Sequence, residues 1–147
     1  MNPAEVRAAA VSVVWLAALA LLLAACAVTE SPATSSEGNI GDPVELVVGT
    51  THAGSVSGDS GQTESYYTFK AKAGGGAHTI TLYNSAQDVA WYLFDDATFT
   101  TLLVACDNKA DSSSEVCVTP ALLGGLSYYL RVHNKTAVGT LYYLVVE

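Results

Sequence analysis

The pattern of apolar and polar positions divides the chain into two parts. Residues 8–25 carry no charge and include a run rich in valine and leucine. From Glu45 onward, short apolar runs are separated by clusters of glycine, aspartate, serine and asparagine, a pattern that predicts β-strands ending at turns. Strands are expected at 45–51, 65–72, 78–83, 89–94, 101–106, 115–119, 126–133 and 140–147.

Alternation within five of these strands predicts a single hydrophobic core. Side chains two positions apart lie on one face of a strand, so each strand presents one apolar set to the interior. The sets are Tyr67, Phe69 and Ala71; Ile80 and Leu82; Val89, Trp91 and Leu93; Tyr128, Leu130 and Val132; Tyr142, Leu144 and Val146. About eight strands at this spacing predict an all-β fold, either a β-sandwich or a jelly roll.

The uncharged segment near the N-terminus has the features of an export signal. It follows a short polar stretch and ends in Leu23-Ala24-Ala25-Cys26, which resembles the lipobox of bacterial lipoproteins. The resemblance implies a signal-peptide helix over residues 1–25, cleavage before Cys26 and lipidation of its thiol. A transmembrane anchor is one alternative, because the uncharged run is just long enough to span a bilayer. An ordinary cleaved signal peptide is the other.

The expected organisation therefore has three parts. Residues 1–25 form the signal peptide, residues 26–43 the lipidated cysteine and a flexible linker, and residues 44–147 the folded domain. The linker is small, polar and punctuated by proline, as a flexible tether should be. Membrane contact is expected through the acyl chains on Cys26. Ala27 stands where aspartate commonly retains lipoproteins in the inner membrane, which favours the outer membrane or the cell surface.

Charge excludes one class of partner. The chain has a formal net charge of −8, and its few basic residues are scattered along the sequence. Nucleic-acid binding needs a basic surface that matches the phosphate backbone, so no nucleic-acid partner is expected. The same acidity opposes adsorption of the folded domain to anionic lipid.

Two cysteines follow Cys26, and both fall in predicted strands. Because an exported chain reaches an oxidising compartment, a disulfide between Cys106 and Cys117 is the expected pairing. A loop of this size would stabilise the fold by roughly 3 kcal/mol in the chain-entropy description. Two free buried thiols are the alternative.

Four motifs in order resemble the bacterial pre-peptidase C-terminal domain. They are Tyr67-Thr68-Phe69 before a glycine turn, Asp88 to Asp95 (DVAWYLFD), the block from Gly125 to Val132, and the closing stretch from Gly139 to Val146. The resemblance covers residues 45–147. It implies a non-catalytic β-module that binds a ligand or assists secretion and folding, and related collagen-binding modules suggest protein recognition, in some cases with calcium. Ala90 stands where members often carry a second aspartate.

Candidate site residues are of two kinds, and none is catalytic, because no acid, base and nucleophile occur at a mechanistic spacing. Alternation places five aromatic side chains away from the core as possible ligand-binding residues: Tyr66, Tyr92, Phe94, Tyr129 and Tyr143. They could instead be strand-forming residues that pack under loops. Weak calcium candidates, which could equally be turn and solubility residues, are Asp95, Asp96, Asp107 and Asp111.

The sequence thus predicts an envelope-anchored lipoprotein that acts as a non-catalytic binding or accessory module for a protein or an envelope polysaccharide. The alternative is a structural envelope lipoprotein with no specific ligand. No cofactor is expected, with calcium left open.

Overall fold

The structure is a computed structural model that describes residues 38–58, 62–108 and 114–147. The predicted signal peptide, Cys26 and most of the linker lie outside the described residues, as does Asp111. The described residues belong to one compact unit, Thr34–Glu147. Because this unit has its own core and disulfide, we expect it to fold without the leader. No helix capable of crossing a membrane occurs in the described part of the chain.

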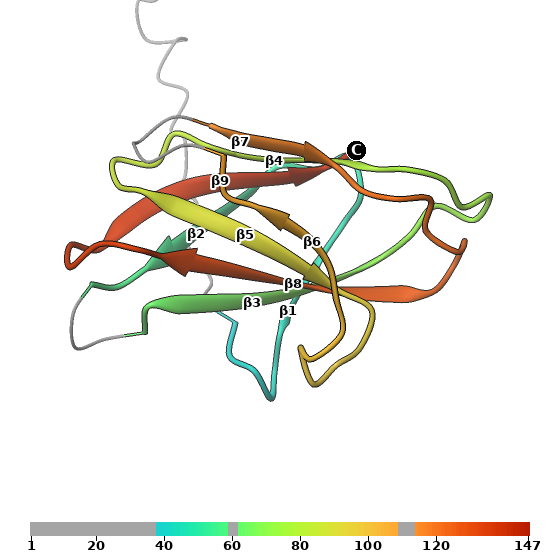
Figure 1. The fold of residues 1–147 in the computed structure, drawn as a ribbon, viewed down its shortest axis with the longest axis horizontal. Helices are drawn as coiled ribbons and strands as arrows, with labels where there is room; N and C mark the ends of the chain where they lie inside the picture. The colour runs from blue at the N-terminus through green and yellow to red at the C-terminus, as the bar shows by residue number, and fades with distance from the viewer. Residues whose placement is uncertain (1–37, 59–61, 109–113) are drawn as a thin grey trace, which may run out of the picture. The chain divides into compact units, whose positions relative to one another are not determined.

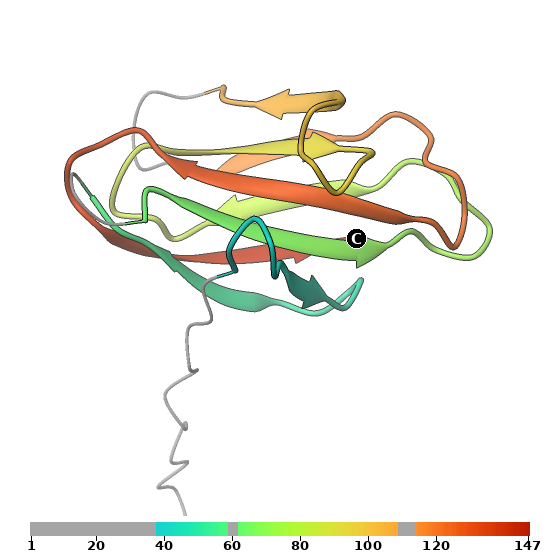
Figure 2. The ribbon, with the colours of Figure 1, turned by 90° about the horizontal axis from the view of Figure 1, so that it is seen from below.

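The described residues form nine strands in two sheets (Figure 1). A five-stranded sheet has the order β1-β3-β8-β5-β6, and a four-stranded sheet has the order β2-β9-β4-β7. The two sheets form the two layers of a β-sandwich (Figure 2). The strand bounds are β1 Val44–Leu46, β2 His52–Val56, β3 Glu64–Lys70, β4 Thr79–Tyr83, β5 Val89–Phe94, β6 Leu102–Cys106, β7 Glu115–Val118, β8 Ser127–Asn134 and β9 Thr140–Val146.

The predicted core is confirmed. All members of the five apolar sets are buried and lie between the sheets. The hydroxyls of Tyr67 on β3 and Tyr142 on β9 are 2.6 Å apart, so a hydrogen bond joins the two sheets inside the core. Burying each tyrosine hydroxyl against another polar group removes the cost of leaving it unpaired.

One strand was missed, and the reason lies in tertiary packing. The sequence predicted a single strand at 45–51, whereas β1 ends at Leu46 and the chain crosses to the other sheet as β2. The crossing passes through Gly49, whose φ of +83° suits glycine. A Cβ on Gly54 would lie 2.5 Å from the Tyr67 hydroxyl and 2.6 Å from the Tyr142 ring. Residues 52–56 therefore form a strand because they fit over this tyrosine pair, although their own β-propensity is weak.

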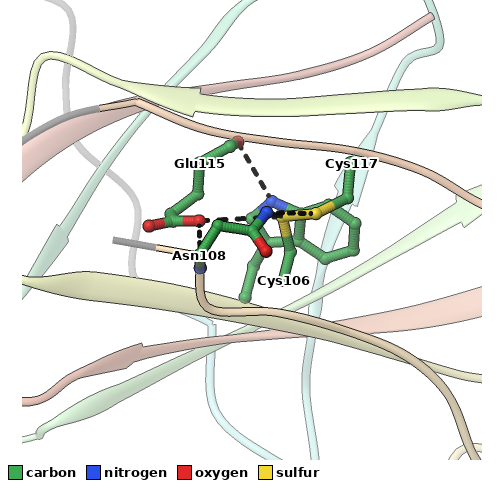
Figure 3. Close-up of a disulfide and its surroundings, with 5 residues drawn as sticks. Cys106, Asn108, Glu115 and Cys117 are labelled. Carbon is green, nitrogen blue, oxygen red and sulfur yellow. Dashed lines mark hydrogen bonds between the residues drawn. A yellow bond between two sulfur atoms is a disulfide. The ribbon is translucent and has the colours of Figure 1, made fainter. Parts of the chain in front are cut away.

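The predicted disulfide between Cys106 and Cys117 is also confirmed. It joins β6 and β7, which are edge strands of different sheets. Asn108 donates hydrogen bonds to the Cys117 Sγ at 3.0 Å and, through its backbone N–H, to the buried Glu115 carboxylate at 2.8 Å (Figure 3). The disulfide and these bonds link the two sheets at the edge formed by β6 and β7.

Candidate binding surface

The predicted aromatic residues do not form one group. Tyr66 on β3, Tyr129 on β8, and Tyr92 and Phe94 on β5 lie on the outer face of the five-stranded sheet. Tyr143 lies on β9, in the four-stranded sheet. It is 38% exposed, and its ring stacks on Tyr83 with the centroids 5.5 Å apart. The structure therefore brings together four of the five residues.

A row of three side chains crosses the middle of the five-stranded sheet. Arg131 on β8 pairs in register with Tyr66 on β3 and with Tyr92 on β5. The Arg131 guanidinium carbon lies 4.9 Å from the centroid of the Tyr92 ring and 5.5 Å from that of Phe94. These distances are typical of cation–π contacts, which hold the long arginine side chain against the sheet. Sequence reasoning missed Arg131, because alternation shows that it points outward, whereas its place between two tyrosines depends on the order of the strands.

Glu64 fixes one end of this row. Its carboxylate lies 3.4 Å from Arg131 Nη1 and accepts a hydrogen bond from the Tyr66 hydroxyl. Partial burial, followed by the hydrogen bond to the Glu64 carboxylate, raises the pKa of Tyr66 to about 12. His133 Nδ1 lies 3.5 Å from the same carboxylate. Tyr66 is therefore a neutral donor at physiological pH, and Arg131 has its charge partly balanced.

A second charged group lies beside the row. Lys135 Nζ is 2.8 Å from Asp107 and 3.2 Å from Asp88. The hydrogen bonds to Asp107 and then to Asp88 raise the pKa of Lys135, so its ammonium stays protonated. Burial and the nearby Asp107 carboxylate raise the pKa of Tyr92, so its hydroxyl stays neutral at physiological pH.

Three polar atoms on this face are buried without a hydrogen-bond partner among the described residues. They are Arg131 Nε, His133 Nδ1 and Asp88 Oδ1. Buried polar atoms are nearly always hydrogen-bonded in proteins, so three exceptions on one face distinguish it from the rest of the described surface.

The loop after β5 covers part of the same face. Phe99 turns its ring back over the sheet, with its centroid 4.8 Å from that of Tyr66, 5.5 Å from that of Phe94 and 5.8 Å from that of Tyr129. Phe94 is only 4% exposed as a result, so it is not available to a ligand. For Phe94 the structure favours the alternative of an aromatic residue packed under a loop. The three tyrosines remain half-exposed.

Asp96 holds this loop in shape. Its carboxylate accepts hydrogen bonds from the backbone N–H of Thr98 at 3.0 Å and of Thr101 at 2.6 Å, and also from the Thr98 hydroxyl. The bond from the Thr98 hydroxyl, followed by that from the Thr101 backbone N–H, lowers the pKa of Asp96 well below its usual range. Phe99 has a φ of 55°, a conformation that is costly for a bulky residue. The Asp96 bonds and the packing of the ring together maintain it.

The calcium candidates are separated. Asp95 and Asp96 follow the C-terminal end of β5, and Asp107 follows the C-terminal end of the antiparallel β6. They therefore lie at opposite ends of the strand pair, and Asp107 is engaged by Lys135. Among the described residues, no group of three or more histidine, cysteine, aspartate or glutamate side chains could hold a metal ion. Calcium binding stays a prediction of the sequence.

Comparison with known proteins identifies the fold. No protein-family model matches the chain, and no curated protein matches it. Among solved structures, the pre-peptidase C-terminal domain of a collagenase from Bacillus anthracis is similar, with a TM-score of 0.59 and 21% identity, covering 72% of this chain and 95% of that domain. A second is PliG of Aeromonas hydrophila, a periplasmic inhibitor of g-type lysozyme, with a TM-score of 0.45 and 16% identity over 71% of this chain and 96% of that protein. The chain is an all-β sandwich with the fold of a pre-peptidase C-terminal domain.

Proposed function

We propose that the protein is an envelope lipoprotein that acts as a non-catalytic binding module. Its binding surface is the exposed part of the outer face of the five-stranded sheet, formed by Arg131 with Tyr66, Tyr92 and Tyr129. The observation that carries this proposal is the row of Tyr66, Arg131 and Tyr92 across three neighbouring strands. The partner is a protein or an envelope polysaccharide.

The composition and the rigidity of this surface suit recognition. Tyrosine and arginine are enriched among the residues that contribute most to protein interfaces. Here they stand on adjacent strands, and Arg131 is already held by the Tyr92 ring and by Glu64. Binding a partner therefore costs little side-chain entropy, because the side chains are ordered beforehand.

The titratable groups of this face support binding in preference to catalysis. Glu64 pairs with Tyr66 and Arg131, and Lys135 pairs with the two aspartates beside it. A general base acts by contacting a nucleophile, whereas these carboxylates contact cations and a phenol. The proposal therefore assigns no reaction to the surface.

Anchoring at Cys26 is supported by the lipobox-like sequence that precedes it. After expression in a bacterium, mass spectrometry of the mature protein should find a chain that begins at Cys26 and carries acyl groups. The Cys26→Ser variant should remain unlipidated. A mature chain that begins at another residue, or carries no lipid, would exclude this anchor without bearing on the binding surface.

The binding surface is tested by capture from an envelope extract with an immobilised domain, residues 38–147. The wild-type domain should retain a partner that the Arg131→Met variant loses. The Lys72→Met variant is the matched control, because it removes the same charge at an exposed position beyond the end of β3. Equal capture by all three domains would contradict the assignment. If the folded wild-type domain retained nothing, the structural lipoprotein would take its place.

A further inference from the structure

His133 lies beside the centre of the proposed binding surface, on the outward side of β8. It is directly opposite Glu64 on β3 and Ala90 on β5. Its ring atom Nδ1 lies 3.5 Å from Glu64 Oε1. The same carboxylate oxygen lies 3.4 Å from Arg131 Nη1. An arginine and a histidine two residues apart on β8 therefore share one oxygen of Glu64.

The other oxygen of this carboxylate is already engaged. The Tyr66 hydroxyl donates a hydrogen bond to Glu64 Oε2, which holds the carboxylate in place. Only Oε1 is left for the two neighbours on β8. Two positive groups that approach one oxygen also repel each other, so a charged His133 would compete with Arg131 for it.

The hydrogen bonding of the histidine changes with its charge. His133 Nδ1 is buried and has no hydrogen-bond partner among the described residues, although Glu64 is close to it. A neutral imidazole carries a proton on one nitrogen, whereas a protonated imidazole donates from both. Protonation therefore gives Nδ1 a hydrogen to donate to Glu64 Oε1, and the buried atom gains the partner that it lacks.

The register of the sheet favours the histidine in this competition. Residues directly opposite one another on neighbouring antiparallel strands approach more closely than diagonal neighbours. His133 is the direct partner of Glu64, and Arg131 reaches the carboxylate along the diagonal. Arg131 also has another contact, because its guanidinium carbon is 4.9 Å from the centroid of the Tyr92 ring. It can stay against the sheet when it loses the carboxylate.

We propose that protonation of His133 switches the binding surface. The charged histidine takes Glu64 Oε1, and the Arg131 guanidinium becomes available to an anionic group of the partner. Histidine is the side chain that ordinarily changes its charge between pH 5 and pH 8. Binding should therefore be stronger at pH 5.5 than at pH 7.5. This consequence for a partner rests on the proposed function, whereas the exchange at Glu64 takes place within the domain.

The surrounding charges act in the same direction. The titratable and charged groups around His133 lie on or next to four strands: Glu64 and Tyr66 at β3, Asp88 and Tyr92 at β5, Asp107 at β6, and Arg131 and Lys135 at β8. Lys135 is held by both aspartates. Among these groups, three carboxylates outnumber two cations by one. A proton on His133 removes this excess, which weakens the repulsion of an anionic partner.

Titration of Arg131 by NMR tests the exchange without a partner. Arg131 is the only arginine in the domain of residues 38–147, so the spectrum contains a single arginine Nε resonance. The resonance would be followed from pH 8 to pH 5.5, above the range in which carboxylates ordinarily protonate. It should move toward its position in the Glu64→Gln variant, and its midpoint should coincide with that of the His133 ring.

Two histidine variants identify the source of the shift. The His133→Gln variant keeps a polar side chain that cannot gain a proton, so its Arg131 resonance should not titrate. The His52→Gln variant is the matched control, because His52 lies on β2 in the other sheet, and its Arg131 resonance should move as in the wild type. A wild-type resonance that does not move, or a shift that persists in His133→Gln, would overturn the proposal.

Sulfate serves as the anionic probe, because its charge is constant over this pH range. At constant ionic strength, sulfate should shift the Arg131 resonance several-fold more at pH 5.5 than at pH 7.5, and the difference should vanish in His133→Gln. An equal response at both pH values would overturn the release of Arg131. Capture from an envelope extract decides the proposed function separately. A domain that captures no partner would still support the switch if its Arg131 resonance titrated as expected.

Discussion

The two outer faces of the sandwich arise from the same alternation of side chains, yet they differ in nearly every other property. The face of the five-stranded sheet carries aromatic and charged residues, and Phe99 packs back over its centre. The face of the four-stranded sheet is mostly apolar along its strands and open, with Leu141 and Val118 largely exposed and Glu147 at the end of β9. Alternation thus determines which side chains leave the core, but the loops and the neighbouring charges determine what each face can do.

Phe94 and Tyr143 illustrate this difference. Both are aromatic, and both point outward from a β-strand. The Phe94 ring is covered by Phe99 and lies in a small cluster outside the main core, whereas Tyr143 stacks on Tyr83 and remains exposed. An outward aromatic residue is therefore part of a packed cluster in one case and an exposed surface residue in the other.

The disulfide should have the largest effect, because it connects the edges of the two sheets that carry these faces. Replacing Cys106 and Cys117 by serine should lower the free energy of unfolding by roughly 3 kcal/mol, since the unfolded chain gains the entropy of the opened loop. Urea denaturation of the variant and the oxidised wild type measures this loss. Equal stabilities would mean that the core alone holds the sheets together.

The covered cluster should contribute more to stability than the open face. The Phe99→Ala variant should lose about 2–3 kcal/mol, somewhat below the range for phenylalanine in a full core, because the cluster lies at the surface. On the open face, Leu141→Ala should change stability by less than ~0.5 kcal/mol. Urea denaturation of both variants compares the two faces directly. Similar losses would mean that the faces do not differ in packing.

The hydrogen bond between Tyr66 and Glu64 should give the five-stranded face a dependence on alkaline pH. The pKa of Tyr66 is raised from 10.0 to about 12 in the folded protein, so its contribution to stability is present below pH 10 and is lost as the pH rises toward 12. At neutral pH the free energy of unfolding of the Tyr66→Phe variant should be about 1 kcal/mol below that of the wild type. Between pH 10 and 12 the variant should lose less stability than the wild type does. Tyr143→Phe is the control and should follow the wild type. Thermal melts at several pH values measure both effects.

The smallest effect is expected at Asp96. Its lowered pKa means that the ionised carboxylate stabilises the loop above the usual aspartate range, and that this contribution is lost as the pH falls through and below it. The Asp96→Asn variant should therefore have a flatter melting temperature between pH 5 and pH 2 than the wild type. Identical acid profiles would show that Asp96 does not hold the loop over Phe94.

Much of the fold was predictable because its signals are local. The apolar sets Val89, Trp91 and Leu93 or Tyr142, Leu144 and Val146 identify their buried faces by alternation alone. The disulfide followed from export chemistry and from the presence of two cysteines after Cys26. Strand β2 could not be read in this way, because Gly54 is accommodated by two tyrosines that are distant in sequence.

The site was less predictable because it depends on how one loop returns to the sheet. The left-handed conformation of Phe99 leaves no signature in the sequence, so the burial of Phe94 could not be foreseen. Arg131 carries the centre of the row, but a single outward arginine gains meaning only once Tyr66 and Tyr92 are known to flank it. The separation of Tyr143 from the other tyrosines required the order of strands in both sheets.

The location of the binding surface is tested most directly by comparing one tyrosine from each face in the same binding measurement. Domains of residues 38–147 carrying Tyr92→Ser or Tyr143→Ser would be titrated against the partner captured by the wild-type domain. We expect Tyr92→Ser to abolish binding and Tyr143→Ser to leave the affinity unchanged. Loss of binding with Tyr143→Ser and not with Tyr92→Ser would contradict this expectation, and would place the binding surface on the four-stranded sheet.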